Sequence, residues 1–138
     1  MNLHAAAEDQ PPFARLLGMT LTEVTADRLV AELIVREELT NRNGVLHGGV
    51  VMAAADNLGG TAAVINLPAG ATTATIESKT NFFAACRPGE TIRIETTPLH
   101  RGRSTMVWQS RITRPDGTLA ALVTQTQIVM PAQRPCCS

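Results

Sequence analysis

The chain has 138 residues, of which 12 are basic and 12 are acidic, so its formal net charge is zero. Hydrophobic residues make up 44% of the chain and aromatic residues 3%. This composition excludes a disordered chain and argues against a nucleic-acid surface. The length predicts one domain over residues 1–138, with flexible tails at about 1–12 and 131–138.

The cysteines and the N-terminus indicate where the protein acts. Cys86, Cys136 and Cys137 are odd in number and lack metal-ligand spacing, which favours a reducing compartment. The opening residues, "MNLHAAAEDQPPFARL", carry acids and two prolines where a signal peptide needs a basic and then an apolar segment. We see no apolar run of membrane-spanning length, and we expect a soluble, cytoplasmic protein.

The first half of the chain predicts a short helix, two strands and one long helix. "FARLLGM" is typical of a short helix that ends near Gly18. Residues 20–36 alternate partly around "TAD", which indicates two strands joined by a tight turn. Residues 47–66, "HGGVVMAAADNLGGTAAVIN", are rich in Ala and apolar on nearly all sides, as in a helix buried in a core.

The second half of the chain predicts four strands. The candidate stretches are "TTATIESKTNFFA", "ETIRIETTPLH", "STMVWQSRITR" and "TLAALVTQTQIVM". They are separated by "CRPG", "RGR" and "PDG", which are typical of turns between antiparallel neighbours. We therefore expect these strands to form a meander, within an α+β fold whose antiparallel sheet wraps around the single long helix.

Several motifs occur together between about residues 16 and 130. They are Asn41, "GVLHGG" at 44–49, Asp56, "NFFAACRPGE" at 81–90 and "RGRS" at 101–104. In these motifs and in its element order, the chain resembles the hotdog-fold acyl-CoA thioesterases, in particular the branch that includes the phenylacetic acid degradation thioesterases. The resemblance implies hydrolysis of an aromatic, short or medium acyl-CoA to free acid and CoA, with no metal and no cofactor.

The spacing of His47 and Asp56 argues against a catalytic pair or a metal site. They are nine positions apart, and at about 100° per residue they lie on roughly opposite faces of a helix. Metal ligands on one helix face are three or four positions apart. We expect His47 to hold the turn before the helix through its ring nitrogens, close to the bound substrate.

Gly48 and Gly49 lie where the predicted helix begins, and the first N–H groups of a helix lack partners within it. Such a donor is suited to the oxyanion that forms when a thioester is attacked. The simpler interpretation is that the two glycines permit a tight turn. The surrounding motifs favour an oxyanion donor on Gly48, with Gly49 beside the substrate.

Asp56 interrupts the apolar run "VVMAAADNLGG", where a carboxylate must be solvated, paired or used in chemistry. Pairing with Lys79 and simple exposure are the structural alternatives. Gly48 and Asp56 are eight residues apart, or about 12 Å along one helix, so a single carbonyl cannot reach both. If both act on one thioester they come from different chains, which predicts a homodimer, and the resemblance implies a dimer of dimers.

The resemblance also assigns roles to individual residues. Gly48 would bind the thioester oxygen and Asp56 would be the nucleophile or general base. Asn41 would hold the acyl carbonyl or the water, and Thr75 would orient water near the acid. Asn41 has the alternative of making a turn, and Thr75 that of an ordinary strand residue.

The resemblance implies that the "RGRS" turn contacts CoA. Arg101, Arg103 and Ser104 would lie near its pantetheine and phosphates, although simple solvation is the common outcome for such arginines. The acyl pocket is expected to include Leu58, Ala62, Phe82 and Phe83. A hotdog-fold enoyl-CoA hydratase or dehydratase and a non-catalytic acyl-CoA binding protein are the alternative functions.

Overall fold

The computed structural model describes residues 7–133 and 136. The elements, in chain order, are α2 (Pro12–Leu17), β1 (Thr20–Val24), β2 (Leu29–Ile34), the 3-10 helix η1 (Glu37–Leu39), α3 (Gly48–Ile65), β3 (Thr72–Phe82), β4 (Thr91–Arg101), β5 (Thr105–Thr113) and β6 (Leu119–Met130). The predicted helices and strands are confirmed. Cys137 and the outermost parts of both expected tails lie outside the described residues.

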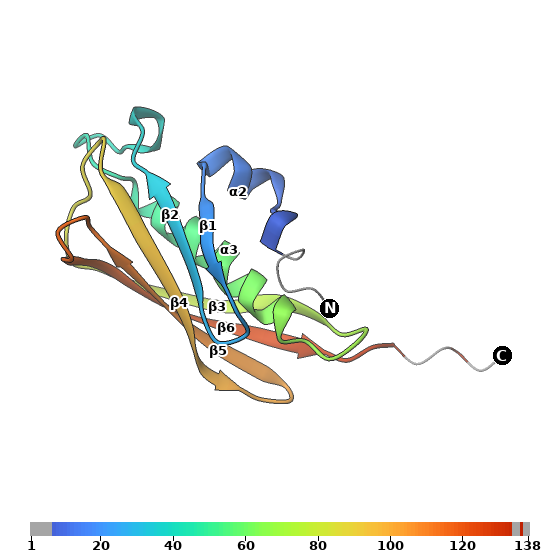
Figure 1. Cartoon of the computed structure of the whole chain (residues 1–138). Helices are drawn as coiled ribbons and strands as arrows, with labels where there is room; N and C mark the ends of the chain where they lie inside the picture. Colours follow the sequence, from blue (N-terminus) through green and yellow to red (C-terminus); the bar gives the residue numbers. More distant parts are fainter. Residues whose placement is uncertain (1–6, 134–135, 137–138) are drawn as a thin grey trace.

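The six strands form one antiparallel sheet in the order β1-β2-β4-β5-β6-β3, and this sheet curves around α3 (Figure 1). The α+β architecture is confirmed. The predicted meander holds for β4, β5 and β6, but it is wrong for β3, which pairs with β6 instead of β4. The "CRPG" segment is therefore a crossover between distant strands. Its backbone is held by other loops, since Leu46 donates to the Cys86 carbonyl and Gly89 donates to the Val35 carbonyl.

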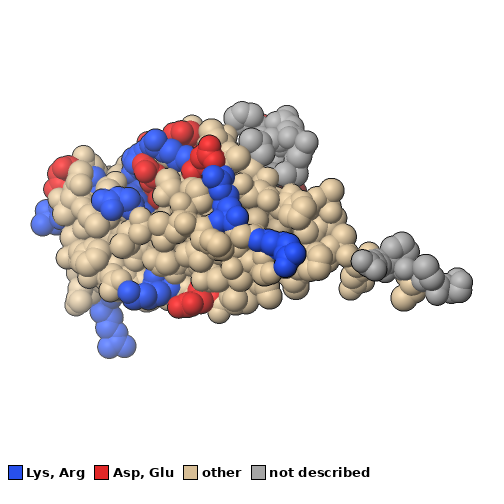
Figure 2. Space-filling model, turned by 90° about the horizontal axis from the view of Figure 1, so that it is seen from below, with Lys and Arg blue, Asp and Glu red and all other residues tan. Residues whose placement is uncertain are grey.

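Charged side chains of both signs are scattered over the face of the molecule seen in Figure 2. Basic and acidic groups lie near one another there, and most of this face is uncharged. The absence of a single-sign field on this face agrees with the zero formal net charge.

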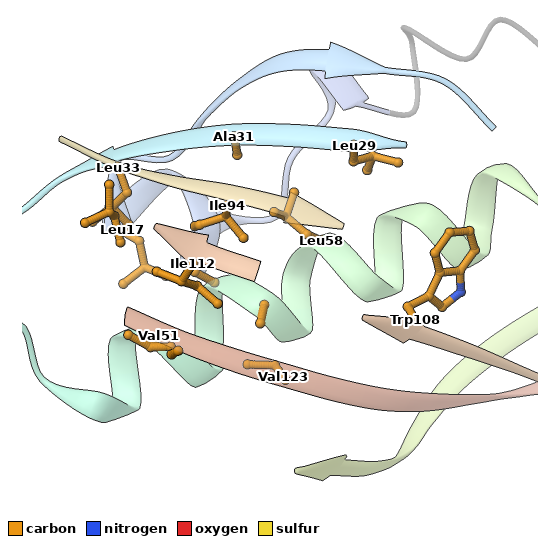
Figure 3. Close-up of a cluster of buried hydrophobic side chains, with 14 of the residues drawn as sticks. Leu17, Leu29, Ala31, Leu33, Val51, Leu58, Ile94, Trp108, Ile112 and Val123 are labelled. Atoms are coloured by element: carbon orange, nitrogen blue, oxygen red, sulfur yellow. The ribbon is translucent and has the colours of Figure 1, made fainter. Parts of the chain in front are cut away.

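The core lies between α3 and the concave face of the sheet (Figure 3). Eight helix residues are buried: Val51, Ala54, Ala55, Leu58, Gly59, Ala62, Ala63 and Ile65. The expectation that α3 is buried on nearly all sides is wrong, because Met52, Asp56 and Val64 form an exposed strip at four- and eight-residue spacing. Residues at these spacings share one helix face. One side of α3 is therefore uncovered in the single chain.

Within the described residues, α3 is also the one helix with the length and apolar composition of a membrane span. The expectation that no apolar run reaches membrane-spanning length is therefore wrong, because α3 has 18 residues of that composition. Because α3 packs on the sheet through its buried residues, it is the core helix of the domain.

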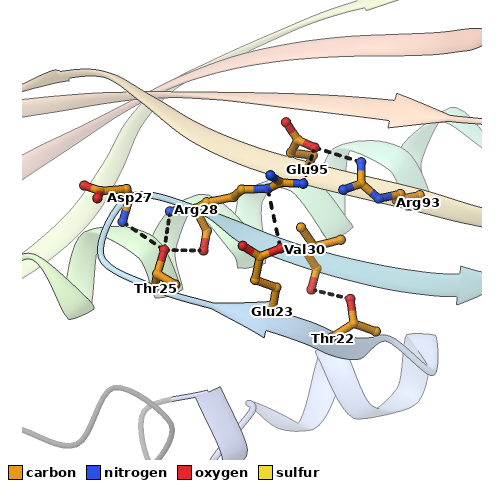
Figure 4. A network of polar contacts seen from close by, with 8 residues as sticks. All are labelled: Thr22, Glu23, Thr25, Asp27, Arg28, Val30, Arg93 and Glu95. Carbon is orange, nitrogen blue, oxygen red and sulfur yellow. Dashed lines mark hydrogen bonds and ion pairs between the residues drawn. The ribbon is translucent and has the colours of Figure 1, made fainter.

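The predicted turn between β1 and β2 is confirmed and is held by polar contacts (Figure 4). The Thr25 hydroxyl oxygen accepts hydrogen bonds from the backbone N–H groups of Asp27 and Arg28. The Arg28 guanidinium contacts Glu23 at 3.6 Å and Glu95 at 3.1 Å. These ion pairs join β1 and β4 to the end of the turn.

The N-terminal segment contacts the long helix. Helix α2 ends at Gly18, whose φ of 79° is a left-handed conformation that glycine adopts freely. Before α2, Ala7 is buried, and Gln10 Oε1 accepts a hydrogen bond of 2.7 Å from Asn57 Nδ2. Part of the segment expected to be a tail is thus packed beside Asp56.

Candidate active site

The N-terminus of α3 leaves one backbone donor free. His47 is the N-cap residue, and its Nδ1 accepts a hydrogen bond of 2.8 Å from the Gly49 N–H. The Val50 N–H donates to the His47 carbonyl. The Gly48 N–H has no acceptor among the described residues. His47 therefore holds the turn before the helix, as expected, and its cap leaves the Gly48 N–H without a partner at the helix start.

Gly48 lies in a pocket of about 390 Å³ that is closed on one side by Phe82. A Cβ atom on Gly48 would be 3.1 Å from the tip of the Phe82 ring, so the ring lies directly against the glycine. Asn41, Phe83, Ala84 and Ala85 also line this pocket, together with Leu46. The expected neighbours Leu58 and Ala62 are fully buried in the core instead, because they lie on the sheet side of α3.

Asn41 makes a turn and also lines the Gly48 pocket. Its Oδ1 accepts hydrogen bonds from the backbone N–H groups of Asn43 at 2.9 Å and Val45 at 3.4 Å. The side chain is fixed by these contacts, while its Nδ2 donors have no acceptor among the described residues. The two interpretations of Asn41 are therefore compatible, since the turn holds the oxygen and leaves the amide nitrogen available.

Asp56 lies on the exposed strip of α3, two helical turns beyond Gly48. Its Oδ1 accepts a hydrogen bond of 2.8 Å from the hydroxyl of Thr75 on β3, the residue that the resemblance places near the acid to orient water. No ion pair joins Asp56 to Lys79 or to another basic side chain in the described part of the chain. The single chain therefore shows an exposed carboxylate held by one hydroxyl.

Two buried glutamines of β6 support this hydroxyl. Gln127 Nε2 donates to Thr75 Oγ1 at 2.6 Å. Gln125 Nε2 lies 3.3 Å from the same oxygen and donates to the Asp56 backbone carbonyl at 3.2 Å. Gly59 makes room for Gln125, because a Cβ atom there would be 2.7 Å from Gln125 Nε2. The close approach of helix and strand thus depends on a glycine next to the acid.

Asp56 opens into a second pocket, of about 560 Å³, that shares no lining residue with the Gly48 pocket. Its walls come from α3, β3, β6 and the segment before α2: Asp9, Gln10, Pro11, Asp56, Asn57, Gly60, Thr61, Val64, Thr73, Ala74, Thr75 and Gln127. The single chain therefore separates the two candidate catalytic groups into different pockets.

In the predicted CoA-contacting turn, one arginine is bound to other parts of the chain, and the other two predicted residues are exposed. Arg101 pairs with Asp27 at 2.7 Å and also donates to the Ala26 carbonyl and to Asn66 Oδ1. Arg103 and Ser104 are exposed. Arg101 is thus bound to the β1–β2 turn and the end of α3, while Arg103 has no ion-pair partner among the described residues.

Sequence reasoning missed Gln10, Asn57, Gln125 and Gln127 beside the acid. The two β6 glutamines share the inward parity of Val123 and Val129, which was the available signal, but the neighbouring threonines make both faces of that strand polar. The contact between Gln10 and Asn57 joins residues 47 positions apart and has no local signal.

The described residues give no alternative metal or thiol centre. Among residues 7–133 and 136, no three His, Cys, Asp or Glu side chains gather closely enough to hold a metal ion. Burial, and next the nearby Glu90 carboxylate, raises the pKa of the Cys86 thiol. The nucleophilic thiolate form of Cys86 is therefore disfavoured.

Comparison with known proteins identifies the family. Residues 43–121, which include Gly48, Asp56 and Thr75, match the family described as the thioesterase superfamily. The chain belongs to this superfamily. Human acyl-coenzyme A thioesterase 13 is 31% identical over 93 residues, which cover 67% of this chain and 66% of the human protein.

Solved structures of thioesterases share the fold. Thioesterase HI1161 from Haemophilus influenzae is 25% identical, with a TM-score of 0.86 and coverage of 99% of this chain and 95% of that one. The PaaI protein of the Escherichia coli phenylacetic acid degradation operon is 20% identical, with a TM-score of 0.84 and coverage of 96% and 93%. At that identity the PaaI likeness concerns the fold alone. The predicted hotdog fold is confirmed.

Proposed function

We propose that this thioesterase hydrolyses acyl-CoA, using Gly48 of one subunit and Asp56 of another. Membership of the thioesterase superfamily supports the reaction, and similarity to human acyl-coenzyme A thioesterase 13 supports the substrate class. The observation that carries the shared site is the separation of the free Gly48 N–H and the Asp56 carboxylate into two pockets. Both groups lie on one helix, about 12 Å apart.

The chemistry follows from the two groups. The Gly48 N–H would donate to the thioester oxygen, where negative charge develops as the carbonyl carbon is attacked. Asp56 would either remove a proton from the attacking water or attack directly to form an anhydride. In both cases the carbon–sulfur bond breaks and CoA leaves as the thiol. Asn41 Nδ2 would hold the carbonyl or the water, and the Thr75 hydroxyl would hold the Asp56 carboxylate that acts on it.

The edge of the sheet supports a dimer. Strand β3 has 11 residues and lies at the sheet edge, paired on one side with β6. A long, exposed edge strand is a template for pairing with another chain. Ile76, Phe82 and Phe83 are exposed along or just beyond this edge. A second copy with its β3 antiparallel to the first would cover these side chains and bring Gly48 toward the partner's Asp56.

The uncovered strip of α3 favours the same partner. Met52 and Val64 flank Asp56 on this strip and are each 42% exposed, so covering them removes apolar area from water. The tetramer implied by the family resemblance is proposed as a dimer of such dimers. Sedimentation equilibrium would distinguish dimer from tetramer.

The pockets and the free arginine support an acyl-CoA ligand. Phe82 and Phe83 would form one wall of the acyl site, and Arg103 would approach the CoA phosphates. Arg101 would act indirectly, by fixing the turn through Asp27. We also propose a cytoplasmic location, which is supported by the free thiol of Cys86.

A hydratase would need a histidine and a carboxylate that converge on the acyl chain. The His47 ring is engaged in the helix cap, which disfavours that reaction. The discriminating measurement is thiol release from a panel of aromatic and aliphatic acyl-CoAs, because hydrolysis releases CoA thiol whereas hydration and binding do not. Release from at least one acyl-CoA is expected, and none from any would contradict the proposal.

Chain mixing tests the shared site. Asp56→Asn and Gly48→Pro subunits are each expected to be inactive, and a mixed dimer retains one intact site of its two. Random mixing makes half of the dimers mixed, so refolding together should restore about a quarter of wild-type activity. The Gly48→Pro substitution is compatible with the preceding backbone, because His47 has φ −64° and ψ 133°, a conformation that a residue before proline favours. No recovery in verified mixed dimers would place the whole site in one chain.

A further inference from the structure

We infer that Gln127 is a positioning residue for the hydrolysis, because its amide directs the Thr75 hydroxyl hydrogen onto Asp56 Oδ1 and leaves Oδ2 as the reacting oxygen. This inference rests on the proposed function. It concerns a residue on the last strand, which reaches the acid through Thr75.

Gln127 is almost fully buried. The residue is 1% exposed, and it lies directly opposite Thr75 in the register of β6 and β3. Opposite residues of an antiparallel pair project to the same face of the sheet, so both side chains are directed toward α3. A buried amide is costly unless its polar atoms find partners. Gln127 Nε2 donates to Thr75 at 2.6 Å, and Oε1 lies 3.1 Å from the Thr73 hydroxyl, whose single hydrogen is shared with the Ile128 carbonyl at 2.8 Å.

The donors around Thr75 determine which atom accepts the hydrogen of its hydroxyl group. A hydroxyl has one hydrogen and two lone pairs, whereas an amide NH₂ can only donate. Gln127 Nε2 at 2.6 Å and Gln125 Nε2 at 3.3 Å both donate to Thr75 Oγ1. The nearby acceptor is Asp56 Oδ1, at 2.8 Å. The Thr75 hydrogen must therefore point to the carboxylate.

The ionised acid favours this orientation of the amide. If Gln127 presented Oε1 to Thr75, the hydroxyl would lie between two acceptors with one hydrogen for both. One of the two short contacts would then lose its hydrogen bond. With Nε2 toward Thr75, both contacts are satisfied while Asp56 is a carboxylate, and each bond polarises the next.

The consequence concerns the two oxygens of Asp56. Oδ1 is engaged by Thr75, while Oδ2 accepts no hydrogen bond from a described residue. The bond to Thr75 restrains the rotation of the carboxylate, so Oδ2 is the oxygen left to meet water or the thioester carbon. A shift of about 1 Å in such a group is enough to lower the rate about 100-fold.

A double-mutant cycle on Gln127 and Thr75 tests this role. Gln127→Met keeps the length of the side chain and removes the donor, and it should lower kcat about 10-fold, as loss of one hydrogen bond predicts. KM should stay within about 2-fold, because loss of transition-state positioning alone leaves ground-state binding intact. Gln127→Met added to Thr75→Ala should lower kcat by less than about 3-fold more, because the amide acts through the hydroxyl.

Gln127→Glu has a side chain of nearly the same shape as the wild type. The pH dependence of its kcat distinguishes a positioning role from a purely structural one. In Gln127→Glu, the introduced carboxyl can donate to Thr75 when protonated and cannot when ionised. The kcat of this variant relative to wild type should therefore fall as pH rises. This variant also replaces Gln127→Met if the latter does not fold. Thr96→Val, which removes a buried hydroxyl bonded to Ser110 elsewhere in the core, is the control and should keep wild-type kcat.

The outcomes separate this inference from the proposed function. Wild-type kcat in both Gln127 variants, or multiplicative losses with Thr75→Ala, would overturn the positioning role while Asp56→Asn still inactivates the enzyme. A wild-type protein that hydrolyses no acyl-CoA would overturn the proposed function and this role with it. Non-multiplicative losses, unchanged KM and the pH-dependent ratio would together support it.

Discussion

The two ends of the candidate site are built in different ways. At Gly48, the functional group is a backbone N–H, and the contacts that leave it free come from the adjacent residues His47, Gly49 and Val50. At Asp56, the functional group is a side chain held by Thr75, which lies 19 positions away on another element. The first end depends on local chain geometry, and the second depends on the packing of α3 against β3 and β6.

This difference predicts how each end fails. A change at the Gly48 end should remove a donor without disturbing the sheet, because helix caps are satisfied locally. A change near Asp56 should move the acid, the hydroxyl and the buried glutamines together, since contacting polar groups are energetically coupled. Substitutions at matched positions can separate these two kinds of dependence.

The largest effect is expected for the acid itself. Asp56→Asn keeps the acceptor for Thr75 and removes the basic carboxylate, so kcat should fall about 1,000-fold or more. Thiol release in single-substrate assays measures this loss. Asp9→Asn is the matched comparison, because Asp9 is the other acidic residue of the same pocket and should change kcat less than about 3-fold. Loss of activity on changing Asp9 instead would mean that another acid carries the reaction.

Removing the donor at Gly48 should have the next largest effect. Gly48→Pro deletes the N–H at a helix position where proline is tolerated, so kcat should fall about 100-fold. Gly48→Ala retains the N–H and adds a Cβ atom 3.1 Å from the Phe82 ring, which is 54% exposed and has room to move. Its loss should be at least about 10-fold smaller than that of the proline variant. Equal losses would indicate that space, and not the donor, matters at this position.

The Gly48 end could largely be predicted from the sequence, for a physical reason. The helix was expected over residues 47–66 and spans Gly48–Ile65, because its start and its apolar content are local properties. The capping role of His47 followed from its spacing relative to Asp56 and from its place before the helix. Each of these inferences needed only neighbouring residues.

The Asp56 end could be predicted only in part, because its contacts join distant segments. Strand β3 was expected beside β4, but β4 pairs with β2 and β3 lies at the edge next to β6. Turn composition predicts a reversal and not the partner across it. The Gln127 contact follows from that pairing, so it was missed along with it. Family resemblance, rather than spacing, identified Thr75.

Substitution of Gly59 tests whether the packing near Asp56 requires a residue without a side chain. Gly59→Ala would place a Cβ atom 2.7 Å from Gln125 Nε2, and overpacking there should lower the free energy of unfolding by about 1–3 kcal/mol. Gly60→Ala is the adjacent control, with no heavy atom within 4 Å of its added Cβ. It should be neutral or stabilising by up to about 1 kcal/mol, since alanine favours helix over glycine. Urea unfolding at one protein concentration compares the two, and equal stabilities would show that Gln125 relaxes freely.

The smallest effect is expected for the helix cap. His47→Ala removes the acceptor of the Gly49 N–H, which should lower the free energy of unfolding by about 1 kcal/mol. His47→Asn supplies a side-chain oxygen that is favoured at the N-cap and should recover most of this loss. Thermal unfolding and kcat are measured for both variants. If His47→Ala and His47→Asn lose kcat alike while His47→Asn keeps its stability, the imidazole takes part in the reaction, and the local account of the Gly48 end is incomplete. If kcat follows stability in both, His47 serves the site through the helix start alone.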